Sequence, residues 1–203
     1  DIRAALGTEL GDHGIDLITG GVVESIEKNG AEFTLCLKDG RAIATDCIMY
    51  ATGRTPNTKG LGLPEAGVTL KDNGAIIVDD WNRTSASNIY AVGDVTDRMQ
   101  LTPVAIQEGR AVSETLFNNN PVTVDYADVA TAVFSTPPVS TVGLTETQAR
   151  EQGHAIDVYE SSFRPLVHTM SGREERTYLK LVVDANSGRV LGAHMVGMDA
   201  PEV

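Results

Sequence analysis

The first quarter of the chain combines helical and alternating apolar patterns, which predict one helix followed by β structure. Ile2, Leu6 and Leu10 recur at every fourth position, so residues 1–13 are expected to form a helix. Residues 15–18, which are apolar except for Asp16, are expected to form a short strand. Three further β segments are separated by Asn-Gly and Asp-Gly pairs, which favour hairpin turns: residues 22–28, 33–38 and 41–45.

The middle of the chain predicts buried strands and one long helix. A strand buried on both faces is expected at 46–51, where residues 47–51 are an unbroken apolar run, and shorter strands are expected at 75–78 and 89–92. Thr102 is expected to be the N-cap of a helix, with Pro103 as its first helical residue. The positions that continue this helix to Phe117 are Ile106, Arg110, Val112 and Leu116. The stretch 118–121 ends it and is a candidate domain boundary.

The last third of the chain has an α+β pattern. A strand is expected at 131–134, and Thr145 with Gln148 forms a capping box that opens a helix to about Gly153. Three strands follow, and the last two form a hairpin through a turn at 184–188: residues 156–162, 178–184 and 190–196. The predicted fold class is therefore α/β followed by α+β.

Composition narrows the possible functions. The 203 residues carry a net charge of −12, which argues against general nucleic-acid binding. No apolar run is long enough to span a bilayer. Cys36 and Cys47 fit neither a disulfide framework nor a metal motif, so we expect two reduced thiols and no metal site.

Two strand ends carry the candidate chemistry. Residues 51–54 read Ala-Thr-Gly-Arg, and residues 92–94 read Val-Gly-Asp. A glycine at such an end lets backbone approach a ligand, and Asp94 can accept hydrogen bonds from sugar-like hydroxyls. The helix start at Thr102 offers free N–H groups to a negatively charged group. The alternatives are a local Asx turn at Asp94 and ordinary helix-start chemistry at Thr102.

Several motifs together resemble those of the flavoprotein pyridine nucleotide-disulfide oxidoreductases. They occur in the family's order: Thr52–Thr58, Tyr90–Asp94, Leu101–Ala105, Val133–Pro138 and Val142–Glu146. Within the family, the chain is most similar to the members that reduce glutathione disulfide. That similarity lies in four segments: Phe163–Leu166, Thr169–Gly172, Leu191–Gly197 and Ala200–Glu202.

The resemblance implies a domain organisation and an activity. Residues 1–52 would be the second half of an NAD(P)H-binding domain, 53–122 the returning segment of an FAD-binding domain, and 123–203 most of a dimerisation domain. The implied protein is a cytoplasmic homodimer in redox homeostasis that uses FAD and NADPH. Electrons would pass from NADPH to FAD, to an active-site disulfide and then to glutathione disulfide.

The resemblance also implies roles for individual residues. Asp94, which follows Gly93, would accept a hydrogen bond from a ribityl hydroxyl of the flavin. The backbone N–H of Thr102, which follows Leu101, would face the N1/O2 edge of the flavin. The cofactor passage would be lined by Gly53 and Arg54, and the Val133 backbone would contact the nicotinamide. Arg110 would meet a glutathione carboxylate. From the residues alone, Val133 is equally a core valine and Arg110 a solvated helix arginine.

Several parts that the family needs do not occur in this sequence. It has no G-x-G-x-x-G fingerprint, no C-x-x-x-x-C pair and no histidine followed by proline, so none of its residues is assigned a catalytic role. We therefore expect the sequence to be incomplete at both ends. The alternatives are a dihydrolipoamide, mercuric or trypanothione reductase, or a non-catalytic dimerisation module.

The missing fingerprint leads to a first prediction. The 203-residue polypeptide by itself should neither hold FAD tightly nor reduce a disulfide, because the fingerprint supplies the main anchor for the cofactor. The visible absorption spectrum of the purified polypeptide checks this expectation. A stoichiometric flavin band would refute it.

Overall fold

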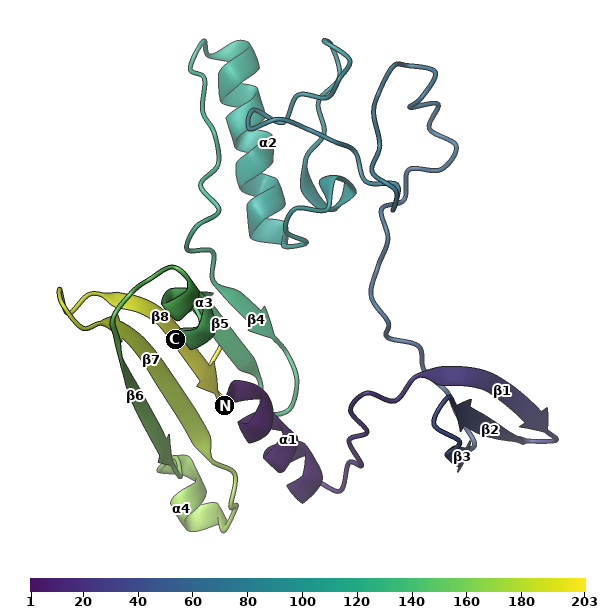
Figure 1. Cartoon of the computed structure of the whole chain (residues 1–203), viewed down its shortest axis with the longest axis vertical. Helices are drawn as coiled ribbons and strands as arrows, with labels where there is room; N and C mark the ends of the chain where they lie inside the picture. The colour runs from purple at the N-terminus through teal and green to yellow at the C-terminus, as the bar shows by residue number, and fades with distance from the viewer. The chain divides into compact units, whose positions relative to one another are not determined.

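The computed structural model describes all 203 residues, and they form two compact units (Figure 1). Residues 1–47 and 126–203 make up the first unit, and residues 48–125 make up the second. Each unit has its own secondary structure. The three domain limits drawn from the sequence stay predictions.

The first unit begins with helix α1 (Ile2–Asp12) and a three-stranded antiparallel sheet. Its strands are β1 (Val23–Asn29), β2 (Glu32–Leu37) and β3 (Ala42–Thr45), in that spatial order. The turns contain Gly30 and Gly40, whose φ angles of 67° and 87° suit glycine. The helix and all three β segments are confirmed.

A five-stranded antiparallel sheet forms the rest of the first unit, in the order β4-β5-β8-β7-β6. Helix α1 packs beside β8, and α3 packs beside β6 (Figure 1). The predicted strands at 131–134, 156–162, 178–184 and 190–196 are confirmed, whereas β5 and α4 were not expected. The bounds are β4 (Thr131–Val133), β5 (Val139–Gly143), α3 (Glu146–Glu151), β6 (Ile156–Phe163), α4 (Val167–Ser171), β7 (Thr177–Asp184) and β8 (Val190–Val196).

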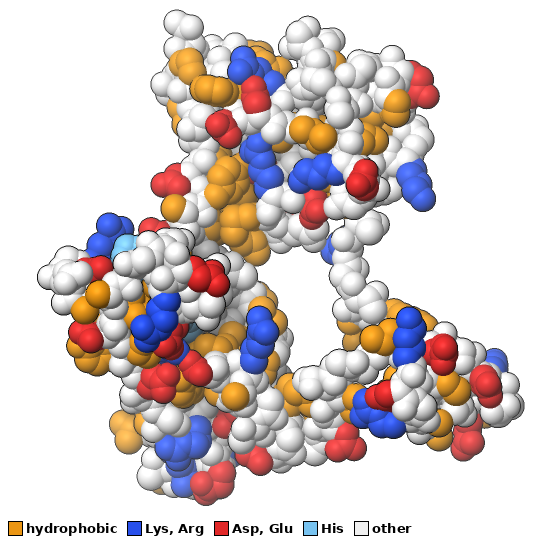
Figure 2. Space-filling model, viewed as in Figure 1, with side chains coloured by type: hydrophobic (Ala, Val, Ile, Leu, Met, Phe, Trp, Pro, Cys, Tyr) orange, Lys and Arg blue, Asp and Glu red, His pale blue; other side chains and the backbone are white.

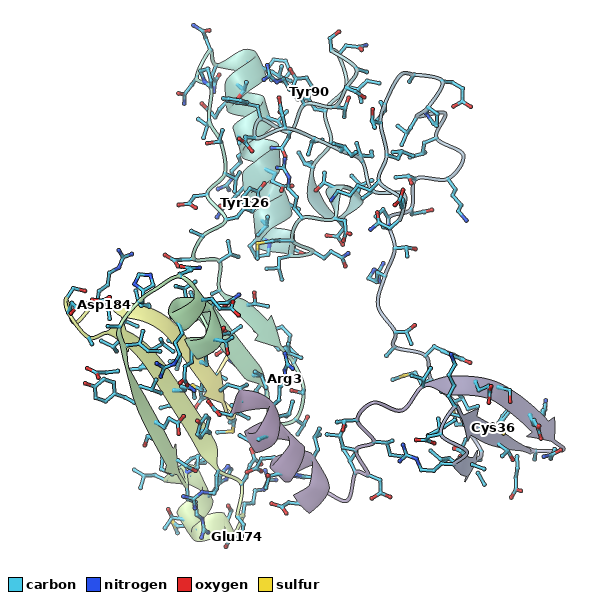
Figure 3. All side chains as sticks on the ribbon, viewed as in Figure 1. Arg3, Cys36, Tyr90, Tyr126, Glu174 and Asp184 are labelled. Atoms are coloured by element: carbon cyan, nitrogen blue, oxygen red, sulfur yellow. The ribbon has the colours of Figure 1, made fainter.

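Local hydrogen bonds explain where two of these elements begin and end. The Thr145 hydroxyl accepts from the Gln148 N–H at 3.3 Å, and the Gln148 carboxamide accepts from the Thr145 N–H at 3.0 Å, so the predicted capping box opens α3. Asp184 lies at the turn between β7 and β8 (Figure 3). Its carboxylate accepts from the Ser187 hydroxyl and N–H, which lowers the pKa of Asp184.

A row of polar residues crosses the five-stranded sheet from edge to edge. Pairing in register aligns Thr131, Thr141, His194, Lys180 and Glu160. Lys180 is 5% exposed, and its Nζ lies 2.8 Å from a carboxylate oxygen of Glu146 and 3.4 Å from one of Glu160. Burial lowers the pKa of Lys180, but the hydrogen bonds and charges of these two carboxylates outweigh burial and raise it.

His194 occupies the centre of this row as a neutral imidazole. Its Nε2 lies 3.1 Å from the Leu144 carbonyl, which can only accept, so Nε2 carries the proton. Nδ1 then accepts from the Thr141 hydroxyl at 2.5 Å. Burial is the largest cause that lowers the pKa of His194, and the positive charge of Lys180 lowers it further.

Two apolar runs that predict strands form none. Residues 15–18 and 46–51 have no strand partner, and the expectation of a doubly buried strand at 46–51 is wrong for this structure. Met49 is 85% exposed and Tyr50 67%, because no other segment of the chain runs beside them to form a ladder. Figure 2 shows hydrophobic side chains, in orange, at the surface throughout the molecule.

The second unit has only two helices, the 3₁₀ helix η1 (Gly93–Thr96) and α2 (Thr102–Phe117). The strands expected at 75–78 and 89–92 are each reduced to a single bridge, one between Leu70 and Ile76 and one between Arg83 and Tyr90. Loops therefore supply one hydrophobic cluster of this unit. The buried residues of that cluster are Val68, Ile76 and Ala91, with Leu63, Leu70, Val78, Ala86, Ile89 and Val95 packed around them.

The cysteine thiols form no disulfide, and the cysteine, histidine and acidic side chains form no metal site. Cys36 lies on β2 (Figure 3), Cys47 is exposed, and both are free. No group of three or more His, Cys, Asp or Glu side chains is arranged to hold a metal ion. None of the helices has the length and hydropathy needed to cross a bilayer.

The neutral state of His194 leads to a prediction of pH-dependent stability. Because folding lowers the pKa of His194, the unfolded chain binds the proton more readily, so the free energy of unfolding should fall as the pH drops below about 6.5. The substitution His194→Gln should flatten this acid limb in urea unfolding measured between about pH 5 and 8. His13→Gln, at an exposed histidine, is the matched control. An equally steep limb in His194→Gln would contradict the prediction.

Candidate functional site

The sequence expected the first part of the site at the end of residues 89–92, where the chain turns into η1. Ala91 is buried in the core of the second unit, and its N–H donates to the Asn82 carbonyl at 3.1 Å. Gly93 follows with φ +74°, and a Cβ at this position would lie 3.1 Å from the Ala105 Cβ on α2. The turn therefore needs glycine for both its backbone conformation and its close approach to α2.

Hydrogen bonds hold this turn on three sides. The Gly93 N–H donates to a Glu108 carboxylate oxygen at 2.5 Å, and the Thr96 hydroxyl donates to the Gly93 carbonyl at 2.9 Å. The Ile76 N–H donates to the Val95 carbonyl at 2.9 Å. The side chain of Asp94 is exposed, so a rigid turn presents this carboxylate to solvent.

The second part of the site is the start of α2. Leu101 is the N-cap, with extended backbone at φ −130° and ψ 128°, and Thr102 is the first helical residue. The expected N-cap was one residue too late, because the extended conformation that a cap requires falls on Leu101. The Thr102 N–H belongs to the first turn, whose amides have no acceptor within the helix. This end of α2 can therefore offer a donor to an anionic group.

The structure packs η1, which carries Gly93 and Asp94, against α2, which begins with Thr102 after Leu101. Arg110 lies farther along α2 with its side chain exposed. Such a guanidinium is free to meet a carboxylate.

The other expected site residues belong to other segments than η1 and α2. Gly53 and Arg54 are exposed in a segment without helix or strand, and Gly53 has φ +103°. Val133 ends β4 in the first unit and is 56% exposed, so its interpretation as a core valine is wrong. A cofactor role for these three residues stays a prediction.

The apolar residues that continue α2 in the sequence are not the ones that its buried face uses. Ile106 and Leu116 are 52% and 44% exposed, whereas Val104, Glu108 and Ala111 are buried. The sequence contained the relevant signal, because these three residues are spaced at i, i+4 and i+7. Because Glu108, the middle residue of these three, is charged, the spacing does not look like an apolar helix face, and Glu108 was not predicted to be buried.

Comparison with known proteins establishes the family. The pyridine nucleotide-disulphide oxidoreductase family matches residues 1–109, and the dimerisation domain of these oxidoreductases matches residues 129–203. The chain belongs to this family, and its mixed architecture with two antiparallel sheets agrees with that membership.

Individual relatives match over the whole of this chain. A glutathione reductase of Burkholderia cepacia is 47% identical over 203 residues, which are 100% of this chain and 45% of that protein. A trypanothione reductase of Trypanosoma congolense is 42% identical over 205 residues, 100% of this chain and 42% of that protein. The HOCl-induced flavoprotein disulfide reductase RclA of Escherichia coli superposes with a TM-score of 0.90 at 34% identity, over 100% of this chain and 46% of RclA. The chain therefore spans a little under half the length of these relatives.

Substitution of two glycines tests the close packing between the turn and α2. Gly93→Ala should lower the free energy of unfolding by about 1–3 kcal/mol, because alanine is strained at φ +74° and its Cβ presses on Ala105. Gly109→Ala, inside α2 with nothing within 4 Å of the new Cβ, should raise it by about 0.5–1 kcal/mol. Urea unfolding of both variants measures the difference. Equal effects of the two substitutions would contradict this account of the turn.

Proposed function

We propose that this chain is part of an FAD-dependent, NADPH-linked disulfide reductase that acts on glutathione disulfide. The observation that carries the proposal is the turn that is held against α2 and presents Asp94 with an exposed side chain. An exposed carboxylate and a free helix-end amide suit, respectively, a hydroxylated chain and an electron-rich ring edge. The residues present therefore fit the ribityl chain and the N1/O2 edge of a flavin.

The chain's own residues have binding and orienting roles in this proposal. Asp94 accepts from a ribityl hydroxyl, and the Thr102 N–H donates to the flavin edge, where it favours negative charge. The backbone of Gly53 and Val133 and the side chain of Arg54 line the nicotinamide side. Bound FAD would supply the redox chemistry between NADPH and a disulfide.

Glutathione disulfide is the substrate that we propose, since the Burkholderia relative named for it is more identical to this chain than the Trypanosoma trypanothione reductase is. The exposed Arg110 guanidinium offers a bidentate partner for a glutathione carboxylate. We propose a homodimer formed through residues 129–203, which match a dimerisation domain. The free thiols suit a reducing compartment, and we propose the cytoplasm.

Turnover tests the substrate. The complete protein that carries this sequence should oxidise NADPH with glutathione disulfide faster than with trypanothione disulfide, and it should show little activity with dihydrolipoamide and NAD⁺. Preference for either of the other substrates would reassign the protein to a different reductase of the family.

The role of Asp94 gives a prediction on cofactor affinity. In the complete protein, Asp94→Ala should weaken FAD binding by about tenfold or more, because a hydrogen bond to a charged acceptor is lost. Titration of the apoprotein with FAD, followed by flavin fluorescence, measures the affinity. Asp80→Ala removes another exposed carboxylate of the same unit and should leave the affinity unchanged. Equal affinities in the two variants would contradict the assignment of Asp94.

A further inference from the structure

Glu108 is the largest fully buried side chain of the chain, with 1% of its surface exposed. It lies on the buried face of α2 between Val104 and Ala111, where an aliphatic side chain would pack at lower cost. A carboxylate is expensive to take out of water, so a buried one is expected to have a specific partner. Its place in this stripe calls for an explanation beyond packing.

The contact with Gly93 supplies that explanation. A Glu108 oxygen lies 2.5 Å from the Gly93 nitrogen, and hydrogen bonds of an N–H to an ionised carboxylate are the short and strong kind. Ala105, three residues earlier and thus on the same face of α2, also lies close to Gly93, because a Cβ at Gly93 would be 3.1 Å from the Ala105 Cβ. Two neighbouring side chains of α2 therefore fix the position of one peptide group.

That peptide group joins Val92 to Gly93 and so lies one residue before Asp94. Rotation about it would change the direction of the Asp94 side chain, and a shift along α2 would change its distance from Thr102. The Thr96 hydroxyl closes the turn on itself, and the Ile76 N–H holds the turn to the loop core, whereas the Glu108 contact holds it to the helix. An aliphatic residue in place of Glu108 would fill the space but leave the buried Gly93 N–H without the carboxylate acceptor.

We infer that Glu108 is a positioning residue that, through the Gly93 N–H, sets the Asp94 carboxylate relative to the start of α2. The inference rests on the proposed flavin-binding function of that pair. Glu108 touches no cofactor itself. Its effect on the flavin includes the hydrogen bond to the backbone of the turn.

Two substitutions separate the position of the acceptor from its charge. Glu108→Gln keeps the length of the side chain and an oxygen acceptor, whereas Glu108→Asp keeps the charge and withdraws it by one methylene. Gln107→Asn makes the same shortening at the adjacent exposed position of α2 and serves as the matched control. All three are made in the complete protein that carries this sequence.

Three measurements are made on each variant: FAD affinity of the apoprotein, hydrogen exchange of the Gly93 amide, and urea unfolding. Glu108→Asp should weaken FAD binding and speed Gly93 exchange by about tenfold or more. Glu108→Gln should change both by about threefold, because a neutral acceptor forms a weaker bond. Gln107→Asn should leave both unchanged. Partial rescue by glutamine is the sign of a positioning role.

Unchanged FAD affinity and unchanged Gly93 exchange in both Glu108 variants would overturn the inference. So would a loss of unfolding free energy without a change in FAD affinity, since that result describes a purely structural role. If Glu108→Asp fails to fold, Glu108→Gln decides: unchanged Gly93 exchange in it refutes the inference. If the unsubstituted apoprotein takes up no FAD, the proposed function fails, and Gly93 exchange still reports whether Glu108 holds the turn.

Discussion

The second unit depends on one close approach, that of the Gly93 peptide to helix α2. Glycine is required there because the turn has φ +74° and because any Cβ would press on Ala105. The Glu108 carboxylate then takes the Gly93 N–H at 2.5 Å. This unit has no strand, only two isolated bridges, so the contact takes the place of sheet pairing and fixes the loop core to the helix that carries Thr102 and Arg110. The geometry of the proposed flavin site follows from it.

In the first unit the equivalent constraint is the polar row across the five-stranded sheet. Thr141, His194 and Lys180 lie side by side in register, and each has a hydrogen-bond or charged partner from a neighbouring strand, loop or helix. Buried polar groups with such partners specify the register of the strands, because a slip of one residue would separate each group from its hydrogen-bond or charged partner. The polar row therefore fixes the strand register of the five-stranded sheet, which lies in the region that matches the family's dimerisation domain.

Local signals in the sequence predicted much of this fold, and distant contacts explain what they missed. Hairpin turns at Gly30 and Gly40 and the capping box at Thr145 are encoded by adjacent residues, so they were found. The run at 46–51 has the composition of a buried strand but has no partner segment, and composition does not report partners. At the site, the resemblance to a family drew attention to Asp94 and Thr102. Glu108 escaped because it acts through a backbone amide fifteen residues away in the chain.

The most direct measurement of the central claim is a crystal structure of the complete protein with FAD bound. The account predicts an Asp94 carboxylate oxygen within about 3.0 Å of a ribityl hydroxyl and the Thr102 N–H directed at the N1/O2 edge of the flavin. It also predicts that the hydrogen bond between Glu108 and Gly93 is retained. A flavin bound away from Asp94, or an Asp94 side chain that instead closes a local turn, would contradict it.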